Sequence, residues 1–155
     1  MSYPGYVRSV LGSALERNVR CHGEENVRDV VRWLCHALKI RPPRLKFQRM
    51  GCSMGWYSKS RHEVRISPDA KRWLVIHEVA HHLHRVEVER RRKEGDCLAG
   101  YENGDSSHGA SFKNCLLACA RLFYGDPADY PWDTEYRAIA NWWKRERKIH
   151  EGGTS

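Results

Sequence analysis

One pentapeptide constrains the fold of this chain more than any other feature: His77-Glu78-Val79-Ala80-His81. Residues four positions apart face the same side of an α-helix, so the two histidines can bind one metal ion only if the segment is helical. A helix start precedes it, because Ser67-Pro68-Asp69 offers a capping hydroxyl, a proline suited to the first helical position and an acid near the positive end of the helix dipole. The sequence therefore predicts a long helix that runs from this start toward Lys93.

The pentapeptide matches the H-E-x-x-H pattern of zinc hydrolases. In that pattern His77 and His81 bind Zn²⁺, and Glu78 is the general base that acts on the attacking water. A catalytic zinc usually takes three protein ligands, so one more is needed. We predict His108, because it opens a helix whose apolar residues share its face and turn that face inward. The residues on that face are Phe112, Cys115, Cys119 and Leu122.

Three other residues compete for the third ligand position. Glu102 lies in a glycine-containing loop and is a ligand type that other zinc proteases use. Cys52, in Gly51-Cys52-Ser53, is similar to the cysteine ligand of peptide deformylases, whose other signatures this chain lacks. His84 shares the helix face of His81 but lies about 10.5 Å along the axis from His77, so we place it at the surface or behind the ligands.

The rest of the pattern predicts an α+β fold, with a small antiparallel sheet packed against the motif-bearing helix and helices at both ends of the chain. Helical spacing and alternation identify the elements, and Pro42–Pro43 ends the second helix. The expected elements are helices at 7–15 and 27–38, strands at 45–50, 54–58 and 63–66, a loop at 95–107, and helices at 108–124 and 134–150. No repeat or linker divides the chain, so we expect a single domain at 1–151 and a disordered tail at 152–155.

The composition excludes several classes of protein. With 41% hydrophobic residues and six Trp, the chain is too apolar to be disordered. Six Cys without close spacing and no secretory leader favour reduced thiols in the cytoplasm. No apolar run approaches the roughly 18 residues of a membrane span, so we expect no membrane association.

The charge balance raises a second hypothesis. The 27 Lys+Arg exceed the 19 Asp+Glu, which gives a net charge of +8 and a pI of about 9.4. A basic protein that binds DNA or RNA non-specifically, with a structural or vestigial zinc site, would carry such charge. The candidate patches are Arg41/Arg44/Lys46/Arg49, Arg85/Arg90/Arg91/Arg92/Lys93 and Lys144/Arg145/Arg147/Lys148. Runs of charge on helices are more often solvated faces, so the hydrolase is the preferred interpretation.

The paired motifs resemble those of a known family. A β-hairpin, a helix with His77-Glu78-x-x-His81, and His108-Gly109-x-x-Phe112 at the start of a later helix are similar to the SprT-like zinc metallopeptidases. They are closer still to short metallohydrolases of actinobacteria and their mobile elements. The resemblance covers roughly 47–124 and implies a zincin-like fold, a polypeptide substrate, the three histidines as zinc ligands and Glu78 as general base. It also implies that the strand at 63–66 lines the cleft and pairs with an extended substrate.

Some features differ from that family or stay open. The charged insert at 85–94 lengthens the interval between His81 and His108, and the cysteine-rich zinc ribbon that follows many catalytic domains of the family is absent. Hydrolysis of a substrate other than a peptide is a third hypothesis, because the same centre activates water. The residue that stabilises the oxyanion is not evident, and Tyr57, Tyr101 or an arginine are candidates.

Overall fold

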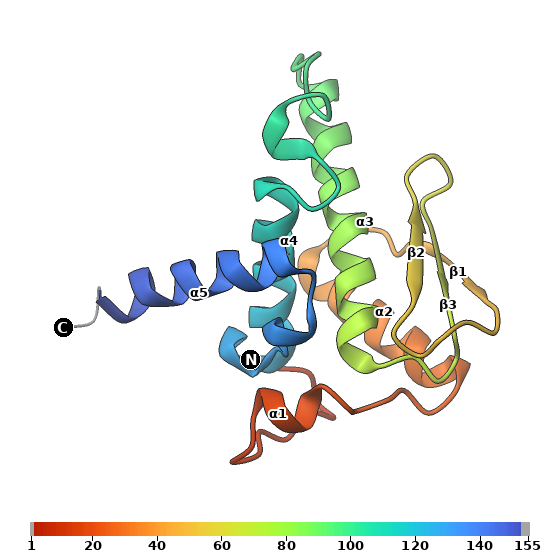
Figure 1. The fold of residues 1–155 in the computed structure, drawn as a ribbon. Helices are drawn as coiled ribbons and strands as arrows, with labels where there is room; N and C mark the ends of the chain where they lie inside the picture. The colour runs from red at the N-terminus through yellow and green to blue at the C-terminus, as the bar shows by residue number, and fades with distance from the viewer. Residues whose placement is uncertain (1, 153–155) are drawn as a thin grey trace.

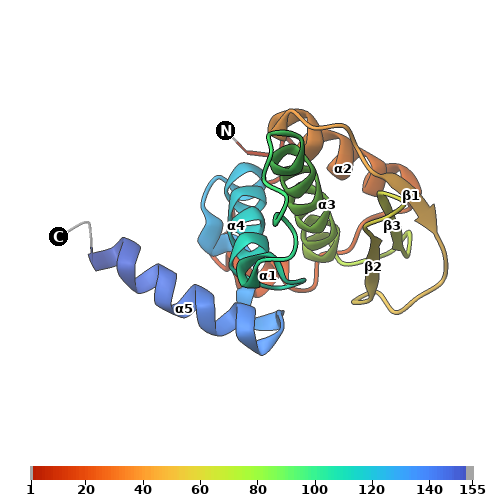
Figure 2. The same ribbon diagram turned by 90° about the horizontal axis from the view of Figure 1, so that it is seen from above.

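Helix α3 (Arg72–Lys93) is the central element of the computed structural model, which describes residues 2–152 of the chain. Helix α4 (Ala110–Tyr124) packs along one side of it, and α2 (Glu24–Leu38) and a three-stranded sheet lie on the other side (Figures 1 and 2). The buried apolar residues of α2, α3 and α4 form one core with Val64 and Ile66 of the sheet. The α+β class is therefore confirmed, as are the helices predicted at 27–38 and 108–124.

The sheet is mixed, so the prediction of an antiparallel sheet is wrong for one of its two pairings. Strands β2 (Gly55–Ser58) and β3 (Glu63–Ile66) form the expected antiparallel hairpin, with Tyr57 opposite Val64. Strand β1 (Arg44–Phe47) pairs in parallel with β3 in the order β1-β3-β2. The segment between β1 and β2 is long enough to carry the chain across β3. Alternation along a strand reports its buried face and not its partner, so the sequence did not reveal this crossing.

This order places β3 in the middle of the sheet, and that contradicts the expectation drawn from the resemblance. Both edges of β3 are occupied by neighbouring strands, so its backbone has no free hydrogen-bonding groups for a substrate. Strand β2 pairs with β3 on one side only, and within residues 2–152 no strand pairs with its other edge. An extended peptide could therefore add to β2 but not to β3.

Helix α3 starts at Arg72, a few residues later than Ser67-Pro68-Asp69 predicted. The Ser67 hydroxyl bonds to the Asp69 carboxylate, so it does not cap the helix, and the Ala70 amide closes a turn onto the Ser67 carbonyl at 3.1 Å. The extended residue Lys71 then precedes the first helical residue. The predicted end near Lys93 is confirmed, so the charged insert does extend the motif helix.

The N-terminal helix predicted at 7–15 is largely wrong. Only α1 (Ser13–Glu16) is helical there, and the side chains of Val7, Val10 and Leu11 are exposed. These side chains have helical spacing but are not covered by other apolar residues, and an isolated short helix is marginal in water. The buried Glu16 anchors this region instead, because it accepts hydrogen bonds from Arg72 at 2.6 and 2.8 Å and from the Tyr124 hydroxyl at 2.7 Å.

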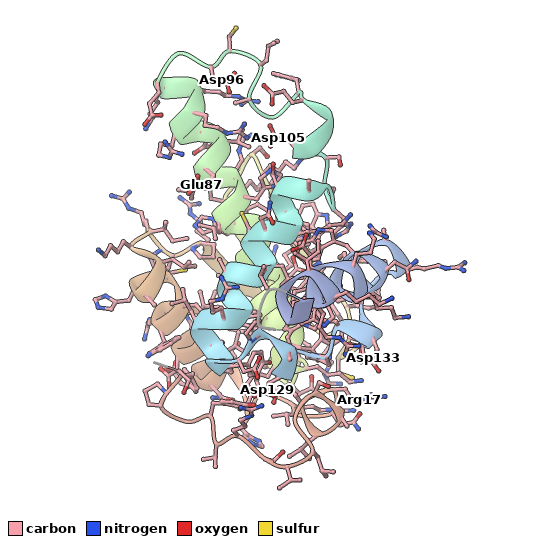
Figure 3. All side chains as sticks on the ribbon, turned by 90° about the vertical axis from the view of Figure 1, so that its left-hand side faces the viewer. Arg17, Glu87, Asp96, Asp105, Asp129 and Asp133 are labelled. Atoms are coloured by element: carbon pink, nitrogen blue, oxygen red, sulfur yellow. The ribbon has the colours of Figure 1, made fainter. Side chains whose placement is uncertain are left out.

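Two segments follow the motif helix. The predicted loop at 95–107 is confirmed and contains a short 3₁₀ turn, η1 (Asn103–Asp105), which folds back toward α3 (Figure 3). After α4 the chain passes through two more 3₁₀ turns, η2 (Pro127–Asp129) and η3 (Trp132–Thr134).

Helix α5 (Arg137–Gly152) starts slightly later than the helix predicted at 134–150 and projects away from the other helices (Figure 2). Its inner face buries Ile139 and Trp143. Of the predicted tail at 152–155, residue 152 ends α5 and 153–155 lie outside the described residues. Among the described helices, none combines the length and the apolar character that crossing a bilayer requires.

Candidate metal centre

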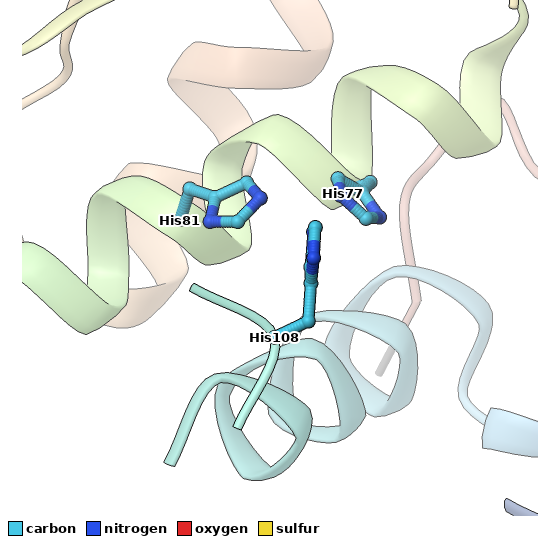
Figure 4. A group of neighbouring side chains, drawn as sticks. All are labelled: His77, His81 and His108. Atoms are coloured by element: carbon cyan, nitrogen blue, oxygen red, sulfur yellow. The ribbon is translucent and has the colours of Figure 1, made fainter. Parts of the chain in front are cut away.

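Three histidines converge between α3 and the segment that leads into α4. His77 and His81 project from the same face of α3, and His108 approaches them from the opposite side (Figure 4). One ring nitrogen from each lies within 4.8 Å of the others, and their ring centroids are 4.9–5.4 Å apart. A metal ion bound about 2.1 Å from each nitrogen would need only small movements of the rings. This group, the His group below, could hold a metal ion.

A tight turn and an aromatic contact position His108. It lies two residues before α4 rather than at the first helical position that the sequence predicted. The Gly109 amide bonds to the Ser106 carbonyl at 3.0 Å, and a Cβ on Gly109 would come within 2.8 Å of the Gly104 carbonyl oxygen. Phe112, in the first turn of α4 and fully buried, stacks on His81 with ring centroids 4.2 Å apart. The apolar face of α4 therefore turns inward, as predicted.

Glu135, a residue that no sequence motif indicated, contacts His77 and orients its ring. The Nδ1 atom of His77 lies 2.6 Å from Oε1 of Glu135, and the Tyr130 hydroxyl donates to the same oxygen at 2.5 Å. If Nδ1 is the donor, Nε2 of His77 is left with a lone pair for a metal, the arrangement by which carboxylates commonly support histidine ligands. Glu135 is 58 positions from His77 and belongs to no motif, so no local signal marked it.

The contact between His77 and Glu135 shifts the pKa of both side chains. Burial alone would lower the pKa of His77, but the hydrogen bond and negative charge of Glu135 outweigh burial and raise it. Burial alone would raise the pKa of Glu135, but the hydrogen bond from His77 and its charge lower it. The pair is thus held together electrostatically inside the protein.

Two buried polar atoms beside the His group have no hydrogen-bond partner among the described residues. They are Nε2 of His108 and Oε2 of Glu78. An unsatisfied buried polar group costs about 1–3 kcal/mol, and a metal ion at the first atom and water at the second would remove that cost. The donor set, three imidazoles next to a carboxyl, also suits a divalent transition metal. The residues present therefore fit a metal ion.

Glu78 points toward the sheet and depends on a glycine there. Burial raises the pKa of Glu78 to about 7, the His77 charge opposes this rise and the Glu135 charge adds to it. A Cβ on Gly55 of β2 would lie 2.8 Å from Oε1 of Glu78. A side chain at position 55 would push the Glu78 carboxyl group from its place, and a glycine inside a strand pattern is the signal that could have indicated this close approach.

The competing ligands do not join the His group. In the part of the chain that the structure describes, no other cluster of three or more His, Cys, Asp or Glu could hold a metal. Glu102 is exposed, and Cys52 is half-buried in the turn before β2. His84 is buried instead of lying at the surface, and its Nε2 is 3.3 Å from Oδ1 of Asp105.

A cleft of about 480 Å³ opens beside His77 and Glu78. Its walls come from the start of β2, the start of α3 and the segment between η3 and α5. They are formed by Ser53, Met54, Gly55, Lys71, Trp73, Leu74, His77, Glu78, Thr134, Glu135 and Tyr136. The cleft therefore gives access to Glu78 and to His77, one member of the His group.

The tyrosine nearest this cleft is not one that the sequence suggested. The exposed ring of Tyr136 lies 4.8 Å from the His108 ring, centroid to centroid, and lines the cleft. The Tyr57 hydroxyl is instead engaged at 2.9 Å with Nδ1 of His82, and Tyr101 lies in the loop above Arg92. Tyr136 is thus the tyrosine that lies both in the cleft lining and beside the His group.

The basic patches differ in how much of their charge is compensated. The α3 arginines contact acids, since Arg90 pairs with Glu94 at 2.9 Å and Arg91 with Asp105 at 2.7 Å. On α5, Lys144 and Lys148 are exposed and form no ion pair within residues 2–149. The α3 patch is therefore mostly neutralised, whereas α5 presents cationic charge to solvent.

Comparisons of the chain with models of protein families, with curated proteins and with solved structures found no match.

Proposed function

We propose that this chain is a zinc-dependent metallohydrolase that cleaves peptide bonds, with His77, His81 and His108 as zinc ligands and Glu78 as general base. The observation that carries the proposal is the convergence of three imidazole nitrogens beside a buried carboxyl group with an unpartnered oxygen. The order of these residues also matches the SprT-like pattern, which favours a zincin-like fold and Zn²⁺ as the metal.

The mechanism follows from what each side chain can reach. When bound, Zn²⁺ supplies a Lewis acid that makes water more acidic and polarises the substrate carbonyl. Glu78 takes the proton of the attacking water at Oε2 and later returns it to the leaving amine. Glu135 holds the His77 ring so that its other nitrogen faces His81 and His108. Tyr136, which lines the cleft beside His108, is the side chain that we assign to donate to the developing oxyanion.

The free edge of β2 supplies a binding mode for the substrate. Gly55 and the preceding Ser53 and Met54 line the cleft, so an extended peptide added to this edge would pass beside Glu78. This corrects the role that the resemblance gave to β3. Main-chain hydrogen bonds of this kind recognise peptide backbone rather than sequence, which favours a polypeptide substrate over a small ester or amide.

Metal content and turnover of matched variants test the proposal. We expect about one zinc per chain in the wild type and in Glu78→Gln by elemental mass spectrometry, and loss of zinc in His108→Ala. Cleavage of a quenched fluorescent peptide library should fall at least a hundredfold in Glu78→Gln, because only the proton acceptor is removed. Glu102→Ala is the control and should keep both metal and activity. Turnover that persists in metal-loaded Glu78→Gln would refute the assignment of the base.

The second candidate function, association with nucleic acid, draws its support from α5. The exposed Lys144, Arg145 and Lys148 lie on its outer side, where they could follow a phosphate backbone. The two functions are compatible, because the cleft and α5 are different surfaces. Substituting these three residues with Gln should weaken DNA binding and reduce its salt dependence while zinc content and peptide cleavage stay unchanged.

A further inference from the structure

The cleft beside His77 and Glu78 is also lined by a lysine, Lys71. Lys71 lines the cleft immediately before α3, and its backbone is fixed because its amide donates to the Cys52 carbonyl at 2.8 Å and the residue forms an isolated β-bridge with Arg20. The residue is half-buried. None of the described acids lies within ion-pair distance of its ammonium group. Asp69, two residues earlier in the chain, contacts Arg20. Lys71 thus offers an uncompensated positive charge inside a binding site.

The start of α3 makes this part of the cleft more favourable for an acid. The 22-residue helix begins directly after Lys71, so the positive end of its dipole adds to the charge of the lysine. The two carboxylates that also line the cleft are Glu78 and Glu135, and Glu135 is engaged with His77.

The helix sets the distance between this charge and the reaction. Lys71 and His77 are six residues apart, which corresponds to about 9 Å along an α-helix. An extended peptide rises about 3.3 Å per residue, so the same distance spans about three substrate residues. A substrate side chain that meets Lys71 therefore belongs to a residue about three positions from the bond that is cleaved.

We propose that the cleft selects polypeptides that carry an Asp or Glu about three residues from the scissile bond, and that Lys71 is the residue that determines this specificity. The inference rests on the proposed peptidase function and adds the class of substrate. The net charge of +8 acts in the same direction, because it draws acidic polypeptides toward the protein before they dock.

The first test measures cleavage of synthetic peptides by the zinc-loaded protein. A fluorogenic peptide carries a single Asp that is moved one position at a time, and each peptide is compared with its Asn counterpart. At the favoured position we expect kcat/KM to be about tenfold higher for Asp than for Asn. Lys71→Met should abolish this preference, and Lys71→Glu should favour a peptide with Lys at that position. Lys46→Met, an exposed lysine on β1, is the matched control and should keep the preference.

The second test measures binding without turnover, so that failure of the inference can be told from failure of the proposed function. Metal-loaded Glu78→Gln is titrated against fluorescein-labelled Asp and Asn peptides, and binding is followed by anisotropy. Tighter binding of the Asp peptide that is lost when Glu78→Gln is combined with Lys71→Met supports the inference. If the wild type then cleaves no peptide, the proposed function fails while the preference for an acidic ligand stands. Equal cleavage and equal binding of both peptides overturn the inference and leave the function standing. Lys71-dependent binding of a single-stranded oligonucleotide, with equal binding of both peptides, also overturns it.

Discussion

Two histidines of α3 that lie seven residues apart, His77 and His84, each contact a buried carboxylate from another segment, and the two pairs differ in what the histidine does. In the first pair, Glu135 contacts Nδ1 of His77, and the ring belongs to the His group. In the second pair, Asp105 contacts Nε2 of His84, and the ring lies outside that group. The two His–carboxylate contacts are chemically similar but have different roles. Glu135 orients a candidate metal ligand, whereas Asp105 holds a loop in place.

The second pair affects the metal centre through the other hydrogen bonds that Asp105 accepts. Its carboxylate also accepts hydrogen bonds from Arg91 at 2.7 Å and from the Gly100 amide at 3.0 Å, so it ties the loop after α3 to the charged part of that helix. His108 follows three residues later in the chain. The charged insert at 85–94 thus anchors the loop through Arg91. None of the residues of the insert lines the cleft beside His77 and Glu78.

The largest difference between the two pairs is expected when each histidine is removed. His77→Ala should lower the bound metal from about one ion per chain to nearly none, because one of three nitrogen ligands is lost. His84→Ala should retain most of the metal, since its ring is not within reach of the other three. Elemental analysis after gel filtration measures both, and circular dichroism establishes that the variants are folded. Equal loss in the two variants would show that His77 and His84 contribute alike to metal binding.

A smaller effect is expected when the first carboxylate is altered. Glu135→Gln keeps the shape of the side chain but removes its charge, so metal affinity should fall about 10–100-fold. Tyr130→Phe is the matched control, because it deletes the second contact to the same oxygen and leaves the contact with His77 intact. Competition with a fluorescent zinc chelator gives both affinities. A larger loss in Tyr130→Phe than in Glu135→Gln would contradict the role given to Glu135.

The smallest effect is expected at the second carboxylate and depends on pH. Burial alone would raise the pKa of Asp105, but hydrogen bonds from Gly100, Arg91, Ser111 and His84 hold it well below its usual range. A carboxyl group with a depressed pKa stabilises the fold above its unfolded pKa, about 4, and loses that contribution as pH falls toward its folded pKa.

The corresponding variant is Asp105→Asn. It should destabilise the protein by about 1–3 kcal/mol at pH 7, and the difference from the wild type should shrink steadily below about pH 4. Urea unfolding of the metal-free proteins at several pH values measures this. A difference that grows as the solution becomes more acidic would show that Asp105 is not ionised in the folded protein.

The two pairs also show how far the sequence could lead. The spacing of His77 and His81 and the apolar face of α4 are local patterns, so the motif helix and the approach of His108 could be predicted. Glu135 and Asp105 act through contacts that span 58 and 21 positions, and no periodicity encodes such partners. The same limit applies to the parallel pairing of β1 with β3. At 7–15 the local pattern itself misled, because apolar spacing forms a helix only where a surface covers it.

The long separation between His77 and Glu135 also bears on synthesis. A ribosome makes the chain from its N-terminus, so the motif helix leaves the exit tunnel well before the residue that orients its first histidine. A nascent chain that ends shortly after His108 already has all three histidines, but the His77 ring has no carboxylate to hold it. The contact that orients the His77 ring forms only when the segment that leads into α5 has been made and folds back against α3, so synthesis of the three histidines alone does not complete the centre.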